Sequence, residues 1–210
     1  MHALAGPRDA FQTVTDTKVK RSHPMIVRSL MLSATLLALA VPLAAAPSDT
    51  DKAASTAAFL EAVKVFNHPR CMNCHTTVNW PTQGDDRHRH TFNVVRGPDN
   101  RGAAGMNCTT CHQAQNQESM NIPGTKDWHM ASLSMGWTGL TPGAWCASLL
   151  DPKKNGGRTG QKVIEHVRAD ALVLWAWTPG GNRKAPQMPH KTFVAALEAW
   201  LGKGAHCPTP

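Results

Sequence analysis

Tyrosine is absent from this chain of 210 residues, and the signals of a β-rich fold are weak. No Asn-Gly turn stands between alternating apolar runs, as it would in a typical β-hairpin. Because tyrosine is missing, the seven tryptophans supply much of the large aromatic surface. We expect them to pack in the core. The alternative for Trp175 and Trp177, near the end of a predicted helix, is that they shape the exposed edge of a bound ligand.

The N-terminal apolar run, from Ser29 to Val41, is short of the about 20 residues that a membrane-spanning helix needs. A basic residue precedes it and small residues follow it, which is the layout of a secretory signal peptide. We therefore predict a signal peptide at 25–46, export to the periplasm and no integral membrane anchor after cleavage. No cysteine directly follows the run to carry a lipid. Residues 1–24 are predicted to be a mis-assigned extension, with translation starting at Met25.

Basic charge is not clustered in this sequence. The formal net charge of +8 falls to +5 without residues 1–46, since five of 22 basic and two of 14 acidic residues are removed. The densest basic group, over residues 87–101, is interleaved with aspartates. This pattern argues against a nucleic-acid-binding face.

Helical spacing of apolar residues predicts a mostly α fold with long irregular loops. Residues 47–58 are small and polar and are expected to form a flexible lead-in to a domain over 59–208. Residues 76–107 are rich in Gly, Asn, Asp and Arg and are expected to be loops. Helices are predicted from Thr56 to His68, from Thr141 to Pro152, from near Thr159 over the segment ending at Trp177, and from His190 to Gly202.

Two CxxCH motifs are the most specific feature: CMNCH at 71–75 and CTTCH at 108–112. Each is a haem-attachment signature, in which the cysteines form thioethers to the vinyl groups and the histidine lies beneath the iron. We predict two covalently bound haem c groups, with His75 and His112 as proximal iron ligands. The predicted attachment residues are Cys71, Cys74, Cys108 and Cys111. A four-cysteine zinc site or a redox dithiol is the alternative, but neither explains a histidine after both pairs.

The motifs are only 37 residues apart, whereas a monohaem cytochrome domain usually needs more chain. We therefore expect a single dihaem cytochrome c domain organised around two covalent haems, with tryptophans packed against them. Cys146 and Cys207 remain outside the motifs, and an oxidising compartment favours a disulfide between them.

Several residues are candidates for the second axial ligand of each iron. A distal histidine lowers the reduction potential of a haem, and a distal methionine raises it. The candidate distal ligands are His90, in RHRH; His129, after Trp128; His166, in the middle of a predicted helix; and the less favoured Met135. Met106 is too close to Cys108 to reach across an iron. Met188 stays a further possibility.

Three further segments accompany the two CxxCH motifs: NWPTQGDD at 79–86, DPKKNGG at 151–157 and LVLWAWTPG at 172–180. Taken together with the motifs, they give most of residues 60–208 a resemblance to a known family. This family consists of exported dihaem c-type proteins that are often labelled isoquinoline 1-oxidoreductase subunits. The resemblance implies a cytochrome that accepts electrons from a partner dehydrogenase, of the molybdenum-containing class.

The expected function is periplasmic electron transfer between a donor dehydrogenase and a downstream acceptor, and not enzymatic turnover. The alternative is a small dihaem peroxidase, for which Glu118 and Glu165 are the nearest acid/base candidates, or a haem-based sensor. A peroxidase needs an open or displaceable iron position, so the coordination of the irons separates these classes.

Overall fold

The computed structural model describes residues 48–209. Helices account for 44% of this part of the chain, and its strands are few and short. The predicted extension at 1–24 and the predicted signal peptide at 25–46 lie outside the described residues. Across residues 48–209, no helix is both long and apolar enough to span a bilayer.

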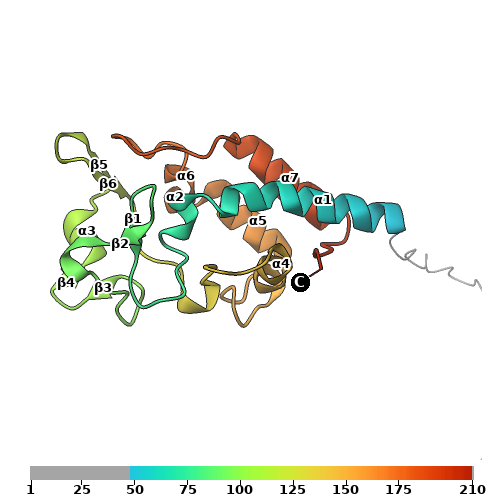
Figure 1. Ribbon diagram of the computed structural model, residues 1–210, viewed down its shortest axis with the longest axis horizontal. Helices are drawn as coiled ribbons and strands as arrows, with labels where there is room; N and C mark the ends of the chain where they lie inside the picture. The colour runs from blue at the N-terminus through green and yellow to red at the C-terminus, as the bar shows by residue number, and fades with distance from the viewer. Residues whose placement is uncertain (1–47, 210) are drawn as a thin grey trace, which may run out of the picture. The chain divides into compact units, whose positions relative to one another are not determined.

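Four longer helices, three single-turn or short helices and three small ribbons make up the fold (Figure 1). The longer helices are α1 (Asp49–Phe66), α4 (Pro142–Leu150), α5 (Gly160–Ala169) and α7 (His190–Gly202). The shorter ones are α2 (Pro69–Met72), α3 (Cys108–Cys111) and α6 (Ala171–Trp175), with 3-10 turns η1 (Thr91–Asn93), η2 (Glu118–Met120) and η3 (Leu133–Met135). The antiparallel ribbons are β1 (Thr82–Gln83) with β2 (His88–Arg89), β3 (Gly102–Ala103) with β4 (Met106–Asn107), and β5 (Gln115–Gln117) with β6 (Ile122–Thr125).

Helix α1 begins earlier than the sequence pattern indicated. Ser48 caps it, because its hydroxyl accepts a hydrogen bond from the Asp51 N–H at 3.1 Å. Asp49 and Asp51 complement the positive end of the helix dipole. The segment 47–58, expected as a flexible lead-in, is therefore helical from Asp49, since its alanines favour a helix as readily as a small-residue loop.

The core forms where α1 and α7 lie side by side (Figure 1). The Phe59 ring lies 5.1 Å from Trp200, and the Phe66 ring lies 5.2 Å from Phe193 with its edge toward that ring. All four side chains are buried. The apolar face of α5 completes the cluster with Val163, Ile164 and Val167.

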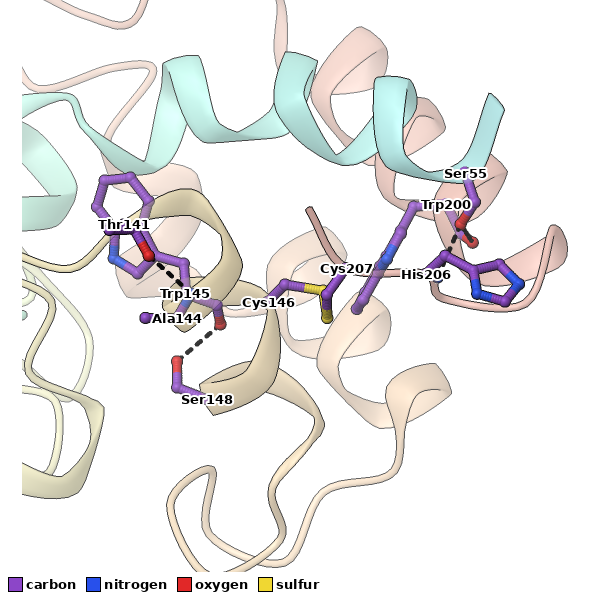
Figure 2. The surroundings of a disulfide bond; sticks show 9 residues. All are labelled: Ser55, Thr141, Ala144, Trp145, Cys146, Ser148, Trp200, His206 and Cys207. Carbon is purple, nitrogen blue, oxygen red and sulfur yellow. Dashed lines mark hydrogen bonds between the residues drawn. A yellow bond between two sulfur atoms is a disulfide. The ribbon is translucent and has the colours of Figure 1, made fainter. Parts of the chain in front are cut away.

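A disulfide and a buried hydroxyl hold the C-terminal tail against these helices (Figure 2). Cys146 in α4 is joined to Cys207, the pair that the sequence predicts. The fully buried Ser55 donates a hydrogen bond to the Trp200 carbonyl at 2.8 Å and accepts one from the His206 N–H at 3.0 Å. The tail is thereby linked to both α1 and α4.

The predicted helix over 159–177 is two helices. Asp170 adopts extended backbone angles, φ −67° and ψ 128°, and its carboxylate accepts from the N–H groups of Leu172 and Val173. This side chain caps α6 and ends α5 at Ala169. Apolar periodicity did not reveal the break, because the apolar residues continue across it.

Candidate functional site

A cavity of about 430 Å³ opens next to the first CxxCH motif. Its walls come from α1, α2, α5, α6 and α7, so it is built by segments that are distant in the sequence. The candidate ligand residues on its walls are Cys71, Cys74, His75, His129, Met135 and His166. Its volume falls in the range of sites that enclose a cofactor, about 300–1,000 Å³.

Helix α2 presents the first motif to this cavity. The His68 side chain accepts from the Arg70 N–H at 3.2 Å, and Pro69 stands at the first helical position. One helical turn then follows, which places Cys71 and Cys74 near each other and brings His75 to the end of the turn. The short helix is therefore set by local capping residues.

The His75 ring is held in one orientation and one protonation state. Its Nδ1 lies 2.8 Å from the Met135 carbonyl oxygen, which can only accept, so Nδ1 carries the proton and Nε2 keeps its lone pair. The ring stacks on Trp137 at 3.4 Å between centroids and 11° between planes. Burial lowers the pKa of His75 to about 4, which keeps the imidazole neutral. A neutral imidazole with a free Nε2 is the form that ligates a metal.

Close approach of residues 135–137 to residues 75–77 creates this environment. The Trp137 N–H donates to the His75 carbonyl at 2.8 Å. A Cβ on Gly136 would lie 2.7 Å from the Thr76 carbonyl oxygen, closer than real contacts allow. Glycine at 136 thus lets the two segments touch.

The second motif repeats the same arrangement on other elements. The Nδ1 atom of His112 donates to the Pro123 carbonyl in β6 at 2.7 Å, so its Nε2 is also free. The His112 ring stacks on Trp128, at 4.4 Å and 7°. Burial lowers the pKa of His112 and favours the neutral ring. Trp128 in turn meets Trp175, a cavity residue, edge to face at 4.8 Å, so aromatic contacts run from the second motif to the cavity of the first.

His90 lies beside the second motif, although it is nearer to the first along the chain. Its ring centroid is 6.0 Å from that of His112, with 78° between the planes. Its Nδ1 lies 2.8 Å from the Thr91 carbonyl oxygen, which again leaves Nε2 free. Two imidazoles on opposite sides of one metal, with bonds of about 2 Å, have ring centroids about 6 Å apart. The separation of His90 and His112 fits such a pair.

Around the first motif, His129 and His166 both line the cavity. His166 is close enough to His75 for its charge to lower the pKa of that ring, and its Nδ1 lies 3.3 Å from the Asp170 carboxylate. His129 contacts the Asp127 carbonyl through Nδ1. His166 is therefore the candidate partner of His75, with His129 as the alternative.

The remaining sulfur and carboxylate candidates have other contacts. The Met135 carbonyl oxygen contacts the His75 ring. Because Met135 is held beside this ring, its sulfur is a poor choice of ligand for the opposite side of the iron. Met106 is exposed, and the Met188 carbonyl accepts from Trp177. Glu118 accepts from the Gly181 N–H, Glu165 pairs with Lys162, and neither glutamate lines the cavity.

The four motif cysteines have free sulfur atoms. Burial raises the pKa of Cys71 to about 12 and that of Cys74 to about 11, so both are thiols at neutral pH. The charge of Cys108 contributes, after burial, to the raised pKa of Cys74. Within residues 48–209, no three side chains of His, Cys, Asp or Glu are arranged so that they could bind a metal ion. The four-cysteine cluster that a zinc site needs is therefore not formed among these residues.

Sequence reasoning missed the residues that orient the histidines. These are the carbonyls of Met135 and Pro123, the stacked rings of Trp137 and Trp128, and Gly136. In the segment LSMGW, residues 133–137, the sequence indicated the sulfur of Met135 as a candidate ligand. The contacts around His75 are made instead by the Met135 carbonyl, Gly136 and the Trp137 ring. A backbone carbonyl carries no signal in the sequence.

Comparison of the chain with protein-family models, curated proteins and solved structures found no match. The donor set itself fits a covalent haem at each motif: two free cysteine sulfurs and one neutral histidine with an available Nε2.

Proposed function

We propose that the protein is an exported dihaem c-type cytochrome that transfers electrons in the periplasm, with both haems in the mostly helical domain. One observation carries the proposal. At both CxxCH motifs the histidine Nδ1 donates to a backbone carbonyl, at 2.8 Å for His75 and 2.7 Å for His112, and Nε2 is left to bind iron. A redox dithiol and a four-cysteine zinc site use no histidine, so neither explains this repeated orientation.

A bound haem iron supplies one-electron chemistry, accepting an electron from a reduced donor and passing it to an acceptor. The chain contributes the rest. The carbonyls of Met135 and Pro123 hold the proton on each Nδ1, and stacked tryptophans fix the ring planes. The contact of Trp128 with Trp175 joins the aromatic packing of the second motif to the cavity of the first.

The proposed partners are a donor dehydrogenase and a downstream acceptor. The family resemblance adds the expectation that the donor contains molybdenum. Peroxidase chemistry needs an acid/base group near an open iron position, and Glu118 and Glu165 are engaged elsewhere. The carrier function therefore has more support from the site than the enzyme.

The positions of the other histidines support an assignment of the axial ligands. We assign His112 with His90 to one haem, from their 6.0 Å ring separation. We assign His75 with His166 to the other, because both line one cavity and His166, unlike His129, is close enough to His75 for its charge to affect the pKa of that ring. Four histidine ligands predict two six-coordinate, low-spin haems with low potentials.

An optical and magnetic-circular-dichroism redox titration of the wild type and of His90→Ala, His166→Ala and His129→Ala tests this proposal. The wild type is expected to show two bis-histidine haems and no peroxide turnover. H90A and H166A should each convert a different haem to a high-spin form, while H129A, the matched control from the same cavity, should change neither. Peroxide turnover by a high-spin wild-type iron would instead identify the enzyme.

A further inference from the structure

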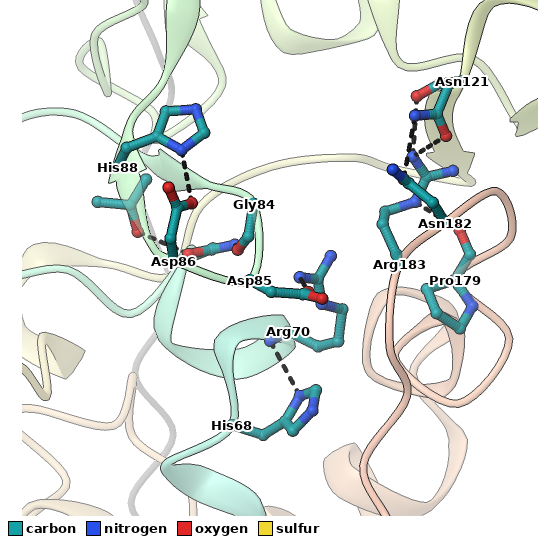
Figure 3. Close-up of polar contacts among 12 residues, drawn as sticks. His68, Arg70, Gly84, Asp85, Asp86, His88, Asn121, Pro179, Asn182 and Arg183 are labelled. Atoms are coloured by element: carbon teal, nitrogen blue, oxygen red, sulfur yellow. Dashed lines mark hydrogen bonds and ion pairs between the residues drawn. The ribbon is translucent and has the colours of Figure 1, made fainter.

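Among residues 48–209, four arginines have a buried side-chain nitrogen without a hydrogen-bond partner: Arg70, Arg87, Arg96 and Arg183. Two of them, Arg70 and Arg183, lie across from each other (Figure 3). Arg70 directly precedes Cys71 and lines the cavity, and its side chain is 3% exposed. Its Nη2 pairs with Asp85, yet its buried Nε has no partner. Buried donors are nearly always hydrogen-bonded in folded proteins, so an unpaired one points to a partner outside the chain, such as a ligand or a water molecule.

Arg183 shows the same feature on a different segment. Its Nε donates to the Pro179 carbonyl at 2.8 Å, and its Nη1 donates to the carbonyl and side-chain oxygens of Asn121, both at 2.8 Å. These contacts fix the guanidinium in place, whereas its Nη2 is buried with no partner. Figure 3 shows Arg183 with Asn121 across from Arg70 with Asp85.

Each guanidinium group lies beside one motif. Arg70 directly precedes Cys71 in α2. Arg183 donates to the carbonyl of Asn121, two residues before Pro123, whose carbonyl accepts from His112. Burial lowers the pKa of Arg183 and the charge of Arg70 lowers it further, in agreement with the placement of the two arginines in Figure 3.

The carboxylates in this region do not use the unpaired donors. Asp85 bonds Nη2 of Arg70, and Glu118, which is within charge range of Arg183, accepts from the Gly181 N–H. An oxyanion placed between the two arginines would satisfy both Arg70 Nε and Arg183 Nη2. A planar guanidinium is well suited to bind a carboxylate through such N–H groups.

We propose that Arg70 and Arg183 form a carboxylate-binding site between the two haems and that it binds haem propionates. This inference rests on the proposed function, since a haem carries its carboxylates at the edge away from the iron. Positive charge beside a haem favours the reduced iron and raises its potential. Because the arginines interact with each other, the site links the electrostatics of both haems.

Redox titration of Arg183→Gln, Arg183→Lys and the control Arg168→Gln tests the site. Arg168 pairs with Glu198 on the exposed side of α5 and does not line the cavity. R183Q is expected to lower the potential of one or both haems, while R183K, which keeps the charge, and R168Q should stay near the wild type. If R183Q fails to fold, resonance Raman spectra of R183K provide the test. The propionate bending bands should shift in R183K and not in R168Q.

Three results would overturn the inference, and each is distinct from a failure of the proposed function. Two low-spin haems with wild-type potentials in R183Q, or unchanged propionate bands in R183K, mean that Arg183 does not bind a propionate. A shift of the wild-type potentials by inorganic phosphate at constant ionic strength, absent in R183Q, identifies a free-anion site instead. Fewer than two haems in the wild type would reject the proposed function itself.

Discussion

Replacing Gly136 with alanine probes the contact that orients His75. The backbone angles of Gly136, φ −70° and ψ 132°, suit any residue, so glycine is not needed for conformational freedom. An added Cβ would lie 2.7 Å from the Thr76 carbonyl oxygen and 3.0 Å from the Thr77 Cα. Both are backbone atoms, so residues 135–137 must move away.

The cost follows from forcing a methyl group into a packed contact, about 1–3 kcal/mol. For a domain of this size each 1 kcal/mol lowers the melting temperature by about 2–4 °C, which gives a fall of about 2–12 °C. The displacement also removes the Met135 carbonyl from His75. The haem at the first motif should therefore change its potential, because the Nδ1 partner tunes the ligand.

Circular-dichroism melting and redox titration of the haem-loaded proteins measure both effects. The control is Gly202→Ala at the end of α7, where a Cβ meets no atom within 4 Å and alanine favours the helix. G202A should not lower the melting temperature. If G136A melts within about 1 °C of the wild type, a change below about 0.5 kcal/mol, and keeps both potentials, the account of the close contact is wrong.

Three further predictions concern stability. Replacing Cys146 and Cys207 together by alanine should lower the free energy of unfolding by about 4 kcal/mol, because a 61-residue separation closes a large loop; urea midpoints measure this, and a fall near zero contradicts it. Ser55→Ala should cost about 1–3 kcal/mol in the same assay, since the buried Ser55 hydroxyl no longer bonds the Trp200 carbonyl and the half-buried His206 N–H; an unchanged midpoint contradicts it. The hydrogen bond from His166 lowers the pKa of Asp170 from 3.8 to about 2, so this carboxylate contributes stability above pH 3.8 that is lost as pH falls toward 2. Melting temperatures across that range should fall less steeply in Asp170→Asn than in the wild type, and parallel curves contradict the prediction.

Local signals in the sequence predicted several elements. Thr141 and Pro142 at the start of α4, and Thr159 before α5, are capping residues whose effect depends on the next three positions only. The CxxCH motifs are equally local. The disulfide partners could be named because only Cys146 and Cys207 remained outside the motifs.

Features that depend on distant contacts could not be predicted. The loops over residues 76–107 bring His90 to His112 rather than to His75, and no periodicity describes that path. The break at Asp170 depends on a side chain capping the next helix. The docking of Gly136 on Thr76 joins residues 60 positions apart, and a single glycine does not reveal which distant segment packs against it.

The number of covalent haems tests the central claim most directly. Mass spectrometry of the mature protein, produced with the c-type maturation machinery and digested between the motifs, reports the haem on each peptide. We predict one haem attached through Cys71 and Cys74 and a second through Cys108 and Cys111. A peptide that carries both cysteines of its motif without haem in the fully matured protein would contradict the claim.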